Sequence, residues 1–227
     1  MPAVAGEIDG PRLAPRGGAA RRLVVFLHGY GADGNDLIEL GRAWQDILPD
    51  TAFVSPHAPE PCSQAPTGRQ WFALTFRDPD ERWTGVNKAA PALERFLDAE
   101  LARHKLAPSA LALVGFSQGT MMALHIGLRR AIAPAAIVGY SGVFVLPNNA
   151  APDAIAAEVK SRPPVLLVHG DRDDLIPPQA LFHAAEALAA LEVPVEWHMS
   201  AGVGHGIDGE GLRHGGEFLT RRFGLRG

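Results

Sequence analysis

The sequence predicts an α/β protein whose mostly parallel sheet is covered by helices on both faces. Several short runs are continuously apolar, as in strands buried on both faces; examples are 23–27, 110–114 and 165–168. Stretches with apolar residues at helical spacing alternate with these runs, which is the pattern of a parallel sheet with crossover helices. A length of 227 residues suits one domain with a buried core and is short for two.

The first half of the chain predicts two strands and two helices around a long loop. These are a strand at 23–27, a helix at 35–47, a strand at 52–54, a loop or hairpin at 57–85 and a helix at 86–104. Pro91 lies inside the second helical pattern, so it is expected to mark the true start of that helix or a kink.

The second half repeats the alternation more regularly. We expect strands at 110–114, 136–140, 165–168 and 195–199, and helices at 120–130, 153–160, 178–191 and 210–223. Residues 1–20 match no element and are expected to be a disordered or extended segment, with one domain over 21–227. The longest interruptions, 57–85 and 142–163, are too short for a separate cap domain.

Composition excludes several function classes. A net charge of −4 with scattered basic residues argues against nucleic acid as a partner. The single cysteine, Cys62, excludes an internal disulfide, and no Cys/His set has zinc-site spacing, so no metal is expected. Neither a signal peptide nor a run of about 18–20 apolar residues is present, which favours a soluble cytoplasmic protein without stable membrane insertion.

The segment Gly115-Phe116-Ser117-Gln118-Gly119 lies between a predicted strand and a predicted helix. This is the context of a G-x-S-x-G nucleophile elbow, in which a sharp turn lifts the serine hydroxyl above the sheet. The glycines are needed because the flanking positions have no room for side chains. The alternative is an ordinary glycine-rich turn with a capping serine.

A serine nucleophile needs a base and an acid that orients it, expected in the order Ser, Asp or Glu, His. His205 follows the last predicted strand and is the candidate base. The candidate acids Asp171, Asp173 and Asp174 follow the strand at 165–168, and spacing does not choose among them. Other histidines are expected in surface or core positions of helices and strands: His104, His125, His183, His198 and His214.

His28-Gly29-Tyr30-Gly31 ends the first long strand and is similar to the loop that supplies an oxyanion donor in esterases. On this interpretation the backbone amides of Tyr30 and Gln118 are the two donors. The run 29–34 is also a literal G-x-G-x-x-G dinucleotide fingerprint. That fingerprint requires a carboxylate about 20 residues on, which the strand ending at Val54 lacks, so a dinucleotide-binding enzyme is a remote alternative.

With these residues identified, the chain resembles the carboxylesterase/phospholipase family of α/β-hydrolases, which includes the acyl-protein thioesterases. The matching stretches are LVVFLHGYGADGNDLI (23–38), FVSPHAPEP (53–61), GRQWF (68–72), LALVGFSQGTMMAL (111–124), VLLVHGDRDDLIP (165–177) and GVGHGI (202–207). The resemblance implies an α/β-hydrolase fold without a cap domain or cofactor. It also implies Ser117 as nucleophile, Asp173 as acid and His205 as base.

The implied function is a serine carboxylesterase that hydrolyses esters of short to medium acyl chains through an acyl-enzyme. Acyl-protein thioesterase or lysophospholipase activity is the alternative, and a non-catalytic binding protein is a remote one. The partner is then a small acyl ester or thioester; the oligomeric state, including a homodimer, stays open. Trp71 and Phe72 are expected either to line the acyl groove or to pin their loop, while Phe144, Leu175 and Ile176 are further candidates for the groove.

Overall fold

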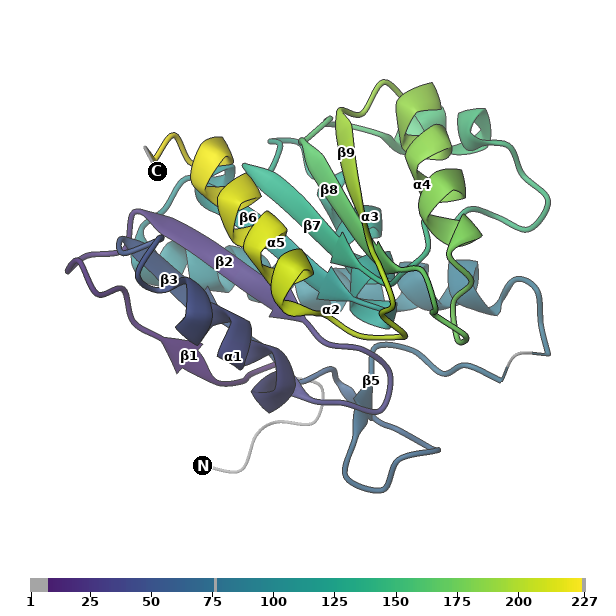
Figure 1. Ribbon diagram of the computed structural model, residues 1–227, viewed down its shortest axis with the longest axis horizontal. Coiled ribbons are helices and arrows are strands. Elements are labelled where there is room, and N and C mark those ends of the chain that lie inside the picture. Colours follow the sequence, from purple (N-terminus) through teal and green to yellow (C-terminus); the bar gives the residue numbers. More distant parts are fainter. Residues whose placement is uncertain (1–7, 76, 226–227) are drawn as a thin grey trace.

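The computed structural model describes residues 8–75 and 77–225, and its centre is a twisted sheet of seven strands (Figure 1). The strand order is β1-β3-β2-β6-β7-β8-β9, and every neighbouring pair is parallel except β1 with β3. The strands are β1 (Arg12–Leu13), β2 (Arg22–Leu27), β3 (Thr51–Val54), β6 (Leu111–Phe116), β7 (Ala136–Tyr140), β8 (Val165–Gly170) and β9 (Val195–Ser200). The predicted mostly parallel sheet is therefore confirmed.

Five α-helices in the described residues cover the two faces of this sheet. They are α1 (Gly34–Trp44), α2 (Glu81–His104), α3 (Gln118–Gly127), α4 (Gln179–Ala190) and α5 (Gly209–Arg222). Helices α1 and α5 lie together on one face, and α2 and α3 lie behind the sheet (Figure 1). Helix α4 packs beside β9 and contributes to the same core as α2 and α3.

Strand β2 shows why its apolar run is continuous. Leu23, Val25 and Leu27 belong to the core under α2, α3 and α4, whereas Val24 and Phe26 belong to the core under α1 and α5. All five side chains are fully buried. Burial of one such side chain contributes about 1.5–3 kcal/mol, so a polar residue on either face would be costly.

Several elements differ from the sequence prediction in their bounds or type. Helix α3 ends at Gly127 rather than at residue 130. Helix α2 begins at Glu81, so Pro91 lies in its interior, exposed to solvent, and does not mark its start. Its first turn was missed because residues 81–84 have no buried apolar stripe. Helix α1 ends at Trp44, and Ile47 beyond it is 45% exposed. The helix expected at 153–160 is a 3₁₀ helix, Pro152–Glu158.

The long segments between these elements contain little regular structure. A two-stranded hairpin, β4 (Glu60–Pro61) with β5 (Arg69–Gln70), lies in the segment predicted as a loop or hairpin. A short 3₁₀ helix, Pro108–Ala110, leads into β6. Within residues 8–75 and 77–225 no separate cap is formed, and no helix is both long and apolar enough to cross a bilayer.

The first seven residues of the segment expected at 1–20 lie outside the described part of the chain. Residues 8–20 include β1, which pairs with β3, and the buried side chain of Ile8. Arg12 also donates hydrogen bonds to both carboxylate oxygens of Glu100, at 3.1 and 2.8 Å. Glu100 lies on α2 and its side chain is 2% exposed, so this ion pair ties β1 to the helix.

Candidate active site

Four loops with candidate residues meet at one edge of the sheet. The segment 28–31 follows β2, Ser117 follows β6, Asp173 follows β8 and His205 follows β9. These strands are parallel, so their carboxyl ends share one edge, where α/β proteins build their sites.

Ser117 lies at the sharp turn from β6 into α3 with a strained backbone (φ 53°, ψ −115°). A Cβ atom on Gly115 would lie 2.4 Å from the carbonyl oxygen of Gly119, and one on Gly119 would lie 1.7 Å from that of Leu27. Only glycine fits at either position. Strain of this kind costs about 1–3 kcal/mol and persists only where the surroundings enforce it.

Hydrogen bonds to the neighbouring strand hold this turn. The Ser117 amide donates to the carbonyl of Tyr140 at 2.9 Å. The buried Thr120 hydroxyl lies 2.9 Å from the carbonyls of both Gly115 and Tyr140. The turn is therefore anchored to β7 from both sides of Ser117.

The two predicted oxyanion donors lie on the segments that flank Ser117. Gln118 is the first residue of α3, so its N–H points out of the positive end of the helix dipole. A Cβ on Gly29 would lie 3.3 Å from the Cβ of Ser117, which places the loop of Tyr30 against the serine. Within the described part of the chain, neither amide donates to another protein group. Both N–H groups are therefore free to bind an anionic oxygen.

His28 holds the loop that carries Tyr30. Its Nε2 accepts the Ala58 amide at 2.9 Å, so the proton is on Nδ1, which donates to the Gly29 carbonyl at 2.8 Å. The His28 carbonyl accepts the indole N–H of Trp71 at 2.9 Å. Burial lowers the pKa of His28 to about 4, so the imidazole is neutral near pH 7.

The buried Gln118 side chain fixes the loop on the other side of the site. Its Oε1 accepts the Trp71 amide at 2.9 Å, and its Nε2 donates to the Phe72 carbonyl at 2.8 Å. Trp71 and Phe72 are only 1% and 2% exposed, and the Phe72 ring packs against Gly85 of α2. This geometry favours the interpretation that both rings pin their loop to the core, rather than forming an open wall of an acyl groove.

Asp173 and His205, the predicted acid and base, are joined by a hydrogen bond. One oxygen of Asp173, Oδ2, accepts the Nδ1–H of His205 at 2.8 Å, and Oδ1 accepts the amides of Leu175 and Ile176 at 3.0 and 2.9 Å. Burial by itself raises the pKa of Asp173, but the hydrogen bonds from Ile176, His205 and Leu175 outweigh it, so the pKa lies below its usual value. The ionised carboxylate keeps the His205 proton on Nδ1 and leaves Nε2 free to accept one.

The other two acids have different positions. Asp171 is exposed and accepts the Gly202 amide at 2.6 Å, and Asp174 is also exposed. Of the three candidates that spacing left open, Asp173 makes the hydrogen bond to His205.

A second buried histidine, His169, was not predicted to belong to the site. Its Nε2 lies 2.8 Å from the Ile176 carbonyl, which only accepts, so this nitrogen is a donor. The same nitrogen lies 3.2 Å from Oδ2 of Asp173. His169 therefore fixes the turn from Asp173 to Ile176. Its position just before the segment 171–176 is the one sequence feature that could have indicated this role.

Next to His205 lies a surface pocket of about 270 Å³. The ring of Phe116, the residue before Ser117, is 4.9 Å from that of His205 and forms part of the lining. The rest is mostly apolar: Leu37, Leu40, Ile207, Gly206 and Asp36. The α1 residues of this lining were not predicted from the sequence, because they look like ordinary core positions of an amphipathic helix.

The three remaining pocket candidates lie elsewhere. Leu175 is 71% exposed beside Asp173, and Ile176 is half-buried against the core. Phe144 is also half-buried, close to Gly142, where a Cβ would lie 3.0 Å from the Ser117 carbonyl oxygen. All three lie outside the lining of the pocket at Phe116.

The neutral, buried His28 predicts that acid destabilises the protein. The unfolded chain binds a proton at His28 near pH 6.5 and the folded chain only near pH 4, so the free energy of unfolding falls as pH falls through this interval. His28→Gln should reduce the slope of this free energy by about 1.2 kcal/mol per pH unit near pH 5, measured by urea unfolding at several pH values. Ser55→Ala, a nearby buried position without a titrating group, is the control and should keep the slope. An unchanged slope in His28→Gln would contradict the lowered pKa of His28.

Comparison with known proteins identifies the family of the chain. The profile of the Phospholipase/Carboxylesterase family matches residues 9–222. Acyl-protein thioesterase 1 of Gibberella zeae is 25% identical over 93% of this chain and 95% of its own length. Esterase YpfH of Escherichia coli is 27% identical over 86% of this chain and 80% of its own.

A solved structure supports the same family and shows the same fold. The crystal structure of esterase PE8 superposes with a TM-score of 0.89 at 44% sequence identity, covering 95% of this chain and 99% of that one. Together with the family match, this likeness shows an α/β-hydrolase fold. The chain therefore belongs to the phospholipase/carboxylesterase family and is a serine hydrolase.

Proposed function

We propose that this serine hydrolase cleaves carboxylic esters of short to medium acyl chains through an acyl-enzyme on Ser117. The observation that carries the proposal is the Asp173–His205 hydrogen bond, at the sheet edge where Ser117 adopts its strained turn. A serine hydroxyl is a weak nucleophile without a base, and an oriented neutral imidazole supplies one.

The reaction has two half-reactions. His205 Nε2 takes the hydroxyl proton as the Ser117 oxygen bonds to the acyl carbon, and then gives that proton to the departing alcohol as the ester bond breaks. In the second half-reaction, His205 takes a proton from a water molecule as the water attacks the acyl-enzyme, and returns it to the Ser117 oxygen as the carboxylic acid is released. Throughout, Asp173 holds the His205 tautomer and stabilises the imidazolium form.

The amides of Tyr30 and Gln118 stabilise the tetrahedral intermediates. Charge builds on the carbonyl oxygen as the serine adds, and two preorganised N–H donors bind that oxygen more tightly in the transition state than in the substrate. The free N–H groups on either side of Ser117 support this role. No cofactor is needed for this chemistry.

The pocket at Phe116 supports a modest acyl group. A volume of about 270 Å³ with a largely apolar lining accommodates a short to medium chain next to His205. Leu175, Ile176 and Phe144 are proposed as contacts for the remainder of the substrate. Acyl-protein thioesterase activity is the second candidate, favoured by the thioesterase relatives, and lysophospholipase activity requires a longer apolar site.

Replacement of the proposed nucleophile tests the mechanism. Ser117→Ala should lower kcat for p-nitrophenyl butyrate by at least about 10³-fold, because no acyl-enzyme can form. Circular dichroism and thermal unfolding of the same sample serve as the folding control. The wild-type chain should react with a serine-directed fluorophosphonate, and the variant should not. Turnover at the wild-type rate by the folded variant would disprove the role of Ser117, and an unreactive wild-type chain would favour a non-catalytic binding protein.

The acid is tested by three matched amide substitutions. Asp173→Asn should lower kcat by about 10³–10⁴-fold, because the amide no longer stabilises the imidazolium or fixes its tautomer. Asp171→Asn and Asp174→Asn change the charge by the same amount within the same loop and should retain most of the activity. Steady-state kinetics on all three decides, and greater sensitivity at Asp171 would contradict the assignment.

An acyl-chain series separates the substrate classes. We expect kcat/KM on oxygen esters to peak between butyrate and octanoate. Each methylene that fits the pocket contributes about 1–3 kcal/mol, and longer chains gain nothing more because the pocket is already filled. Matched thioesters of the same acyl groups are measured in parallel. A consistent preference for thioesters would favour the thioesterase alternative, and a maximum at palmitoyl esters or lysophospholipids would contradict the short-chain proposal.

A further inference from the structure

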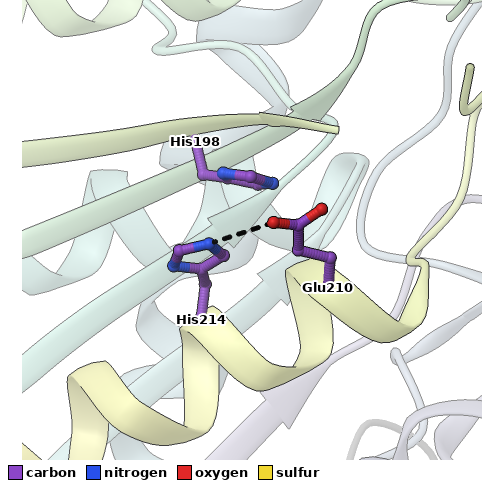
Figure 2. Close-up of side chains that lie close together, drawn as sticks. All are labelled: His198, Glu210 and His214. Atoms are coloured by element: carbon purple, nitrogen blue, oxygen red, sulfur yellow. Dashed lines mark ion pairs between the residues drawn. The ribbon is translucent and has the colours of Figure 1, made fainter. Parts of the chain in front are cut away.

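Three metal-ligating side chains gather between β9 and α5, outside the proposed active site. Figure 2 shows His198 on β9 facing Glu210 and His214, which lie one turn apart on α5. Each offers one ligand atom, and the three atoms all lie within 4.8 Å of one another. On α5, Oε1 of Glu210 lies 3.8 Å from Nε2 of His214.

The imidazole rings of His198 and His214 are direct neighbours. Their rings stack with centroids 4.1 Å apart and 29° between planes. Nε2 of His198 is buried and has no hydrogen-bond partner among the described residues, an arrangement that is costly for a polar atom.

The chemistry of this set fits zinc. Two imidazole nitrogens and one carboxylate oxygen are ligand types that Zn²⁺ binds at about 2.0–2.2 Å, with water in a remaining position. In a tetrahedral site with such bond lengths, ligand atoms are about 3.3–3.5 Å apart. The present spacing therefore requires side-chain movements of little more than about 1 Å. The Glu210 side chain is 55% exposed and that of His214 is 33% exposed, so both have room to adjust.

One basic side chain competes for the site. Arg213 lies 3.2 Å from Nε2 of His214 and 3.7 Å from a carboxylate oxygen of Glu210. It also donates to Glu217 at 2.8 Å, on the exposed side of the helix. A metal ion can therefore displace Arg213 from His214 while Arg213 keeps its bond to Glu217.

We propose that His198, Glu210 and His214 bind one Zn²⁺ ion that links β9 to α5. Strand β9 ends at Ser200 and α5 begins at Gly209, so the ion closes the loop 201–208 that carries His205. The Ser200 hydroxyl already bridges this loop through Asp208 at 2.8 Å. The ion adds a second link and takes no part in the ester chemistry. The sequence analysis expected no metal, because these ligands lie on separate elements and match no spacing motif.

Zinc binding to the untagged, chelator-treated full chain tests the proposal. Isothermal titration with ZnCl₂ should give one ion per chain. At a free zinc concentration about 100 times the Kd, the thermal midpoint should rise by roughly 5–10 °C through mass action. His198→Gln, Glu210→Gln and His214→Gln should each weaken binding by at least about tenfold.

Two matched substitutions exclude other zinc sites. His183→Gln removes an exposed histidine from α4 and should bind zinc as the wild type does. His205→Gln removes the only histidine of the proposed acid–base pair and should also keep the ion. Full-strength binding in the double variant His198→Gln/His214→Gln, or its loss in His205→Gln, would overturn the proposal. Ser117→Ala should bind zinc normally, so failure of the esterase mechanism and failure of the metal site are distinguishable.

Discussion

The close contact between the first turn of α3 and the end of β2 is the constraint on which the site depends. Gly119 lies so near the Leu27 carbonyl that no side chain fits between them, and this contact enforces the strained turn at Ser117. The same contact sets the position of Gln118, whose amide N–H is free and whose side chain clamps the segment with Trp71 and Phe72. A single packing contact thus positions the proposed nucleophile, one oxyanion donor and the adjoining loop.

The opposite half of the site is organised by electrostatics. The Asp173 carboxylate is nearly buried, and it stays ionised because two backbone amides and the His205 ring satisfy its oxygens. His169 fixes the same turn through the Ile176 carbonyl. The proposed base, His205, is therefore held from the end of β8, while the proposed nucleophile, Ser117, follows β6, and the parallel sheet brings the two strand ends to one edge. The proposed site thus rests on rigid strand ends, and within the described residues no separate cap covers it.

Strand positions and the elbow could be predicted because each has one dominant physical cause. The strands at 23–27 and 165–168 are apolar throughout since both faces are buried, and the G-x-S-x-G spacing reflects two steric contacts. Strand β1, a two-residue Arg-Leu pair, has no pattern to detect. Spacing also could not choose among three nearby aspartates, because the backbone of the turn decides which carboxylate faces His205. The His198–His214 pair could not be predicted from the sequence either, because only tertiary packing brings strand β9 and helix α5 together.

In the proposed mechanism, Ser117 attacks the acyl carbon while the amides of Tyr30 and Gln118 bind the carbonyl oxygen at this sheet edge. The most direct measurement is a crystal structure of the chain after reaction with a fluorophosphonate, whose tetrahedral phosphorus mimics the intermediate. We expect phosphorus bonded to Oγ of Ser117 and a phosphonyl oxygen about 2.7–3.1 Å from the amide nitrogens of Tyr30 and Gln118. An adduct on another residue, or an oxygen directed away from both amides, would contradict it.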